Sequence, residues 1–462
     1  MINKQIIRKF VILLFVSALL GILSRMWGFN SQQALAIAIF SASVLGTVLF
    51  WDMRLSIAFI GASLLLMTKT INFEHFLKFA SFEIILFLIG MMILSGFLKD
   101  SNFFIWIVTL MLRVKNFTAI KFTIIISVMS AVFSCAVGEV TSIIFMVMAV
   151  LEICDFLEVN PTPFVLISVL ATNIGSAGTV LGNPVGILIA AKSGLTFEDF
   201  LVKAFPVMWL ILIAAIVFLI IWFRKPLKEM DAKIKEHGAN DMLIKLISVP
   251  PDKQQIAGIT LLLSTVFLIS MHHRIELFLG LESNTMLFII PILAAAVVMI
   301  WRSHRVLHYI EEDVEWMTLL FFIFFFAQAG TLQYTNASGI LADKLLLLTG
   351  NNINILTPVI LWVSSITSSM LDNVVVVASF IPVIQSFQIV GPAAGQKMWW
   401  ALLFGACLGG NITIIGSTAN IVALGLIEKE RKIKIRFLQW FKPGLAVGVF
   451  TTAIVWLYLL IV

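Results

Sequence analysis

Residues 171–184 read Ala-Thr-Asn-Ile-Gly-Ser-Ala-Gly-Thr-Val-Leu-Gly-Asn-Pro, and residues 405–420 read Gly-Ala-Cys-Leu-Gly-Gly-Asn-Ile-Thr-Ile-Ile-Gly-Ser-Thr-Ala-Asn. Both stretches lie inside long apolar segments, yet they are rich in glycine, asparagine, threonine and serine. Glycine lets a helix unwind, and the freed N–H and C=O groups then need protein or a water-filled cavity around them. The two stretches therefore predict a pair of broken membrane helices whose backbone lines a site.

The rest of the chain has the composition of a membrane protein. Of 462 residues, 60% are hydrophobic and 12% are charged, which is about half the ~25% of charged residues typical of soluble domains. Apolar stretches of 18 residues or more recur, so we expect spanning helices rather than the short alternating strands of a barrel. The expected fold class is an all-α polytopic membrane protein with about 11 transmembrane spans. The composition excludes a soluble enzyme, a disordered chain and a fibrous repeat, and we expect a lipid bilayer but no nucleic acid as a partner.

An offset of 234 positions relates the two halves of the chain. Residues 86–89, Leu-Phe-Leu-Ile, match residues 320–323, Leu-Phe-Phe-Ile, and the same offset links several glycines and threonines. Counting spans from the basic amino end, which the positive-inside rule places in the cytoplasm, gives the two halves opposite orientations. We therefore predict inverted-topology repeats, an architecture of secondary transporters whose site lies at the repeat interface.

The predicted domains follow from the repeat and from the distribution of basic residues. Each half holds one apolar stretch, 122–157 or 353–390, that is too long for one helix and is interrupted by small and polar residues. We interpret these stretches as re-entrant hairpins. The protein is expected to be multi-pass in the plasma (inner) membrane with its amino terminus in the cytoplasm. The domains are an N-terminal transmembrane helix over 1–31, a first inverted repeat over 32–224, a cytoplasmic linker over 225–253 and a second inverted repeat over 254–462.

Two acidic residues stand alone in these hairpins. Asp372 is the only ionisable residue from 345 to 396, and Glu139 is the only one from 122 to 151. Inserting a charged side chain at the centre of a membrane helix costs ~2.5–3.5 kcal/mol on insertion scales. We therefore expect each acid to have a function. Carboxylates at corresponding hairpin tips can bind a cation or carry protons, and we assign both residues to ion coupling. The alternative is that each carboxylate caps a half-helix and satisfies broken backbone.

The broken helices supply the candidate binding residues. Half-helix amino ends favour anions, whereas unwound carbonyls and Asn or Thr oxygens favour Na⁺. Close packing through small residues is the alternative, and it accounts for the glycines better than for the asparagines. No cofactor is expected beyond the coupling ion, Na⁺ or H⁺. The residues expected to bind the substrate or a cation, including a Na⁺ ion at the broken helices, are Thr141, Asn173, Gly175, Thr179, Gly182, Asn183, Asn373, Gly409, Asn411, Thr413, Gly416, Ser417 and Asn420.

These motifs resemble those of the ion transporter superfamily, in its branch of arsenite-pump (ArsB), NhaD-type sodium/proton antiporter and citrate-transporter-like (CitMHS-like) permeases. Residues 368–374, Ser-Ser-Met-Leu-Asp-Asn-Val, resemble the second hairpin motif of that branch, and residues 172–184 and 409–420 are similar to its broken-helix motifs. The first hairpin departs from the pattern, because Glu139 stands at the position of an Asn in NhaD-like members. Asn183 likewise stands where an aspartate is common. The resemblance implies an elevator mechanism, in which a hairpin-bearing unit slides against a scaffold, and a homodimer.

The leading hypothesis is a secondary active transporter of ArsB/NhaD type that moves a small ion with an H⁺ or Na⁺ gradient. A citrate, dicarboxylate or other anion permease of the same superfamily is the alternative. It ranks second because the hairpin tips are acidic and no isolated Arg or Lys lies at the expected midplane to hold a carboxylate. An intramembrane hydrolase using Asp372 and Glu139 is a different class, and a channel is a third. The sequence leaves the substrate, the coupling ion, the stoichiometry and the direction of transport open.

Overall fold

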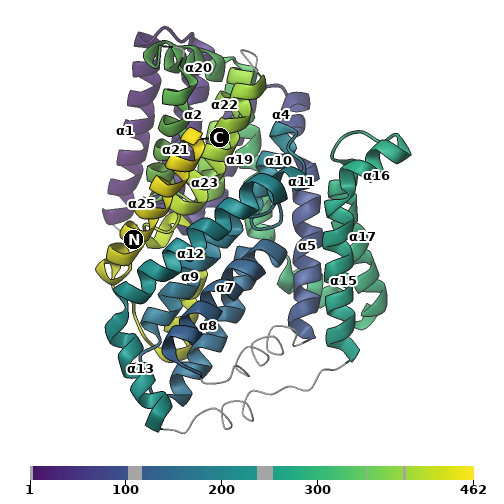
Figure 1. Ribbon diagram of the computed structural model, residues 1–462. Helices are drawn as coiled ribbons and strands as arrows, with labels where there is room; N and C mark the ends of the chain where they lie inside the picture. Colours follow the sequence, from purple (N-terminus) through teal and green to yellow (C-terminus); the bar gives the residue numbers. More distant parts are fainter. Residues whose placement is uncertain (1–3, 102–116, 237–252, 351, 389–391, 462) are drawn as a thin grey trace.

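The computed structural model describes residues 4–101, 117–236, 253–350, 352–388 and 392–461. Helix is the only regular structure within these ranges (Figure 1), so the predicted all-α fold class is confirmed. Helix is what the composition requires, because in lipid each segment must satisfy its own backbone N–H and C=O groups. Within the described ranges, eight helices are long and apolar enough to cross a membrane, or nine if the bent pair Thr285–Trp301 and Ser303–Asp313 is one span. Four further apolar helices are shorter, so the count of about 11 spans stays a prediction.

The amino-terminal helices pack on one another and on helices of the second half. α1 packs on α2, α2 on α3, and α3 on α19, while α5 packs on α17. Figure 1 shows α15, α16 and α17 beside α5 at one edge of the molecule. The helices of the first half are α1 (Lys4–Met26), α2 (Ser31–Leu49), α3 (Arg54–Met67), α4 (Phe73–Phe79) and α5 (Phe82–Asp100). Those of the second half are α15 (Lys253–Ser270), α16 (His272–Leu279), α17 (Thr285–Trp301), α18 (Val306–His308), the π-helix η4 (Tyr309–Asp313), α19 (Trp316–Tyr334) and α20 (Ala337–Leu348).

Each predicted hairpin is a pair of helices with a short break. The first consists of α7 (Ala119–Val137) and α8 (Glu139–Phe156), and the second of α21 (Ile353–Ser368) and α22 (Asn373–Gln388). Gly138 alone separates α7 from α8 and has φ 93° and ψ 155°. Only glycine adopts this conformation without strain, so Gly138 lets the chain reverse within a single residue. The re-entry of both hairpins into the membrane stays a prediction.

The two quoted glycine-rich stretches interrupt two further helices, as the sequence predicts. α9 (Thr162–Ser176) and α10 (Pro184–Ser193) flank the first break, and α23 (Pro392–Gly409) and α24 (Thr418–Arg431) flank the second. The new helix starts are capped by side chains. Asn183 accepts the N–H of Gly186 at 3.0 Å, and Ser417 accepts the N–H of Ala419 at 3.2 Å. Such caps satisfy backbone donors that the break leaves free.

Two glycines bring each hairpin into backbone contact with its broken helix. A Cβ atom on Gly175 would meet the backbone of Ala131, and one on Gly409 would meet the backbone of Ser365. These contacts join α9 to α7 and α23 to α21, and both glycines and both partners are 234 positions apart. The glycines therefore serve close packing, the alternative that the sequence left open for them.

The remaining helices follow the broken helix of each half, and α12 packs on α25. They are α11 (Phe197–Asp199), the π-helix η2 (Phe200–Ala204), α12 (Phe205–Trp222), α13 (Arg224–Glu236) and α25 (Phe437–Ile461). α13 occupies the first part of the expected linker, whose residues 237–252 lie outside the described residues. Leu227 and Met230 of α13 are buried, and Asp231 accepts the N–H of Ala119 at 2.7 Å. The linker thus begins as an amphipathic helix that packs against the start of the first hairpin.

Candidate functional site

The carboxylate of Glu139 lies where the first hairpin meets the second hairpin and both broken helices. Glu139 is the first residue of α8 and is 3% exposed. Its oxygens accept hydrogen bonds from Asn183 Nδ2 at 3.4 Å, Asn373 Nδ2 at 3.5 Å and Ser417 Oγ at 3.5 Å. These separations exceed the ~2.9 Å of an ordinary hydrogen bond. The ring of donors therefore holds the carboxylate loosely, and among the described residues no Lys, Arg or His nitrogen lies within 4.0 Å of it.

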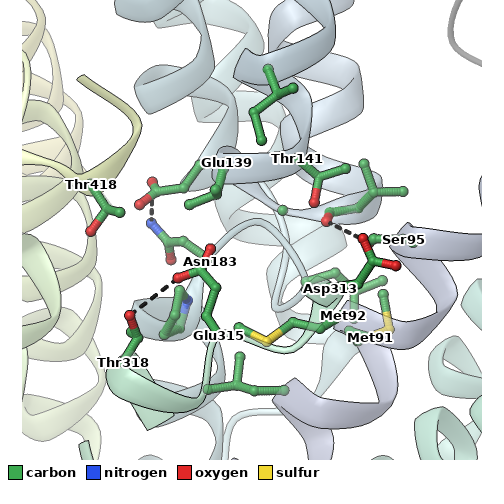
Figure 2. A pocket seen from close by; sticks show the side chains of 18 of the residues that line it. Met91, Met92, Ser95, Glu139, Thr141, Asn183, Asp313, Glu315, Thr318 and Thr418 are labelled. Carbon is green, nitrogen blue, oxygen red and sulfur yellow. Dashed lines mark hydrogen bonds between the residues drawn. The ribbon is translucent and has the colours of Figure 1, made fainter. Parts of the chain in front are cut away.

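Glu139 lines a cavity of about 220 Å³ between the first hairpin and α5. Figure 2 shows its hydrogen bond to Asn183 and the side chains around the cavity. The cavity reaches the molecular surface, because the side chains of Lys99 and Glu312 in its lining are 55% and 70% exposed. The labelled lining residues are Met91, Met92, Ser95, Thr141, Asn183, Asp313, Glu315, Thr318 and Thr418.

Three asparagines of the broken helices are joined by side-chain hydrogen bonds. Asn173 Nδ2 donates to Oδ1 of Asn411 and to Oδ1 of Asn420, each at 2.9 Å. Asn420 Nδ2 in turn donates to the backbone carbonyls of Gly410 at 2.7 Å and Thr413 at 2.9 Å. All three side chains are buried, and Asn173 Oδ1 and Asn411 Nδ2 find no partner within the described part of the chain. An unpaired buried oxygen of this type costs ~1–3 kcal/mol, and it is also a suitable ligand for Na⁺.

The two threonines of the broken helices hold the hairpin tips. The Thr179 hydroxyl donates to the carbonyl of Cys135 at 2.6 Å, and the Thr413 hydroxyl donates to the carbonyl of Ser369. The first contact holds an unwound stretch against the last turn of α7. The second holds the other unwound stretch against the C-cap residue of α21. Backbone also crowds the Cβ positions of Gly182 and Gly416. These four residues shape the site through packing and backbone contacts.

Asp372 faces a second, smaller cavity. Its Oδ1 accepts the N–H of Val374 at 3.0 Å, and its Oδ2 accepts the hydroxyl of Thr418 at 2.7 Å. The first contact caps α22, as the alternative interpretation of this acid predicts. The cavity, of about 10 Å³, is lined by Asp372, Arg54, Thr318 and Thr418. Both threonines also line the larger cavity, so they form the wall between the two.

Arg54 is the residue of this region that the sequence analysis missed. It opens α3, and its Nη2 donates to the hydroxyl of Thr318 at 3.2 Å. The guanidinium lies 4.2 Å from the centroid of the Trp51 ring and 5.5 Å from that of Phe321. Aromatic contacts of this kind stabilise a half-buried guanidinium. The sequence alone gave no signal for this role, because Arg54 ends a short connection and is distant in sequence from Asp372.

The structure thus divides the predicted site residues into groups. One group surrounds Glu139 and consists of Asn183, Asn373 and Ser417. A second consists of Asn173, Asn411 and Asn420. Thr141 lines the larger cavity, whereas Asp372 lines the smaller one. The roles assigned to all of these residues stay predictions.

Comparison with known proteins identifies the family. A family model described as "Citrate transporter" matches residues 51–405. An uncharacterized transporter of Mycobacterium tuberculosis is 30% identical over 379 residues, which cover 82% of this chain and 85% of that protein. A 46 kDa membrane protein of Mycobacterium leprae is 28% identical with the same coverage. The P protein of Homo sapiens is 26% identical over 458 residues, which cover 84% of this chain and 54% of that protein. The chain therefore belongs to the citrate transporter (CitMHS) family of the ArsB/NhaD-like permease superfamily, whose members are transporters and not enzymes.

Proposed function

We propose that this protein is a secondary active transporter that moves a small ion with an H⁺ or Na⁺ gradient, and that Glu139 binds the coupling ion. The observation that carries the proposal is the burial of Glu139 without a cation within 4.0 Å among the described residues. An isolated buried carboxylate is costly, and a bound proton or cation removes most of that cost. The loose ring of Asn183, Asn373 and Ser417 leaves room for either ion.

A Na⁺ ion at the broken helices is part of the same proposal. Asn173 Oδ1 is buried and has no partner in the described part of the chain. Carbonyls of the unwound stretch, such as those of Gly410 and Thr413, lie around the same asparagines. Amide and backbone oxygens are the ligands that broken transporter helices offer to Na⁺.

We also infer that the two halves are inverted repeats and that the protein works by an elevator type of alternating access. Contacts that recur at the 234-residue offset support the repeat. Besides the glycines above, Gly96 lies against Asp313 and Gly330 lies against Phe79. The packing favours two sets of helices, α7–α9 with α21–α24 and α1–α5 with α17 and α19, and α19 also packs on α22 between them. A unit that carries both hairpins could slide along the second set.

We further propose an orientation in the membrane and a dimeric assembly. α13 carries five basic residues, which favour the cytoplasmic side, and these are Arg224, Lys225, Lys228, Lys233 and Lys235. With this side inside, we place the amino terminus, which is also basic, in the cytoplasm. The plasma (inner) membrane and a homodimer follow only from the family resemblance.

An anion permease of the same superfamily is the second candidate. Arg54 is the observation that favours it, because a guanidinium binds carboxylates in a bidentate manner. The intramembrane hydrolase is a wrong alternative. The relatives are transporters, and Glu139 and Asp372 line separate cavities instead of forming a pair.

Reconstitution tests the proposed function. Purified protein in proteoliposomes would be given a pH or Na⁺ gradient and a panel of arsenite, Na⁺, citrate, succinate and sulfate. We expect saturable uptake of at least one of these ions that stops when an ionophore collapses the gradient. Flux that neither saturates nor depends on a gradient would contradict coupled transport and favour a channel.

A further inference from the structure

Arg54 and Asp372 are opposite charges that line one small cavity. Within the described ranges, neither has an ion-pair partner within 4.0 Å. Arg54 opens α3, whereas Asp372 lies directly before α22, and both helices pack on α19. Charges that face each other across protein interior attract more strongly than charges in water. The two opposite charges therefore attract each other across this cavity.

The surroundings of Arg54 hold the guanidinium without neutralising it. Its partners are the Thr318 hydroxyl and the rings of Trp51 and Phe321. Thr318 donates in turn to Glu315 Oε2 at 3.1 Å, as Figure 2 shows. Glu315 is thus a second carboxylate linked to Arg54, but only through a hydroxyl. A test of the pair must separate Asp372 from Glu315.

The surroundings of Asp372 likewise leave its charge without compensation. Its two hydrogen bonds come from a backbone N–H and from the Thr418 hydroxyl, both neutral groups. Neutral donors offset only part of the desolvation of a buried carboxylate. The cavity of about 10 Å³ that it shares with Arg54 is at the lower limit for holding one water molecule. Contact between the two charges therefore requires the second hairpin to move toward α3.

We propose that Arg54 is the counter-ion of Asp372, and that the two form a direct ion pair when the second hairpin moves toward α3. In transport, the guanidinium then competes with a cation for Asp372, the second of the two acids assigned to ion coupling. This second step rests on the proposed function, whereas the electrostatic pairing of the two side chains does not.

A double-mutant cycle in thermal stability tests the pairing without any transport. Arg54→Gln should lower the melting temperature in the wild-type background and have a clearly smaller effect in the Asp372→Asn background. The Glu315→Gln background should leave the full effect of Arg54→Gln in place. Arg302→Gln is the matched control: its guanidinium lies 6.0 Å from the Phe97 ring, and its effect should be the same with and without Asp372→Asn. Equal effects of Arg54→Gln in both Asp372 backgrounds would overturn the proposal, as would a loss of the effect with Glu315→Gln instead.

Uptake measurements test the competition with the cation. Arg54→Gln should lower the cation concentration for half-maximal uptake by roughly tenfold, because a neighbouring positive charge disfavours cation binding by about one logarithmic unit. Arg54→Lys keeps the charge and should remain close to wild type. An unchanged half-saturating concentration in Arg54→Gln would overturn the competition. If wild-type protein shows no gradient-driven uptake, the proposed function fails, and the stability cycle still decides the pairing.

Discussion

The side-chain amide of Asn373 donates to the carboxylate of Glu139 at 3.5 Å, and these two residues stand 234 positions apart. Corresponding positions of the two hairpins therefore meet at the tips. One position carries an acid and the other an amide, so the contact is a donor–acceptor pair rather than a repulsive pair of carboxylates. The acid of the first hairpin, although displaced by one position from the NhaD-like pattern, still contacts the second hairpin.

Converting this contact to two acids should make stability depend on pH. In Asn373→Asp the new carboxylate lies beside Glu139, and two carboxylates so close cannot both be ionised. The variant should therefore be less stable than wild type at pH 8, and the difference should shrink at pH 5, where a proton is available to share. Melting temperatures in detergent at the two pH values measure this. Asn354→Asp, at an exposed position of α21, is the control, and a pH-independent deficit in Asn373→Asp would count against the contact.

The sharp reversal at the first hairpin predicts a requirement for glycine. Gly138→Ala forces a side chain into φ 93° and ψ 155° and should cost ~1–3 kcal/mol of unfolding free energy. Gly194, with φ 75° at the end of α10 and no atoms within 4 Å of a built Cβ, is the control. Gly194→Ala should cost less than Gly138→Ala, ~1–2 kcal/mol, as expected for the left-handed helical region. Chemical unfolding of both variants decides this; equal losses would refute the special strain at Gly138.

Two other glycines should tolerate no side chain because of packing. In Gly175→Ala and Gly409→Ala, the added methyl group would overlap the backbone of Ala131 and Ser365, respectively. Overpacking of this kind costs ~1–3 kcal/mol. Gly425 in α24 has open space at its Cβ, so Gly425→Ala should instead stabilise by ~0.5–1 kcal/mol. Melting temperatures that fall for Gly425→Ala as much as for the other two would argue against the close approach.

The sequence predicted the broken helices and the hairpins because each depends on residue types within a short segment of the chain. Glycine and asparagine in an apolar segment, or a lone acid in a long apolar stretch, are exceptions that composition alone reveals. The offset of 234 residues then related the two halves. Each of these predictions needs only neighbouring residues or a comparison of the chain with itself.

The contacts between the halves could not be predicted in the same way. Asn173 bonds to Asn411 and Asn420 from the other half of the chain, and this choice among several asparagines depends on how the halves dock. Arg54 could not be predicted for the same reason, because only the docking of the second hairpin places Asp372 and Arg54 at the same cavity. The packing role of Gly175 and Gly409 was an open alternative that the backbone geometry supports.

The asparagine cluster predicts an effect of Na⁺ on stability. Asn173→Ala removes the donor to both Asn411 and Asn420 and should cost ~1–3 kcal/mol. If Na⁺ binds here, it raises the melting temperature of wild type by mass action, and this rise should vanish in Asn173→Ala. The measurement compares Na⁺ with choline at equal ionic strength, with Asn354→Ala as the control. A Na⁺-dependent rise of the same size in Asn173→Ala would place the ion elsewhere.

The central claim is that Glu139 binds the coupling ion, and a matched pair of variants on α8 tests it most directly. Glu139 is buried at the first residue of this helix, whereas Glu152 is exposed near its other end. Gradient-driven uptake into proteoliposomes would be measured for wild type, Glu139→Gln and Glu152→Gln, each shown to be folded by its melting temperature. We predict that Glu139→Gln loses uptake driven by the H⁺ or Na⁺ gradient while Glu152→Gln retains it. Undiminished gradient-driven uptake in folded Glu139→Gln would contradict the account.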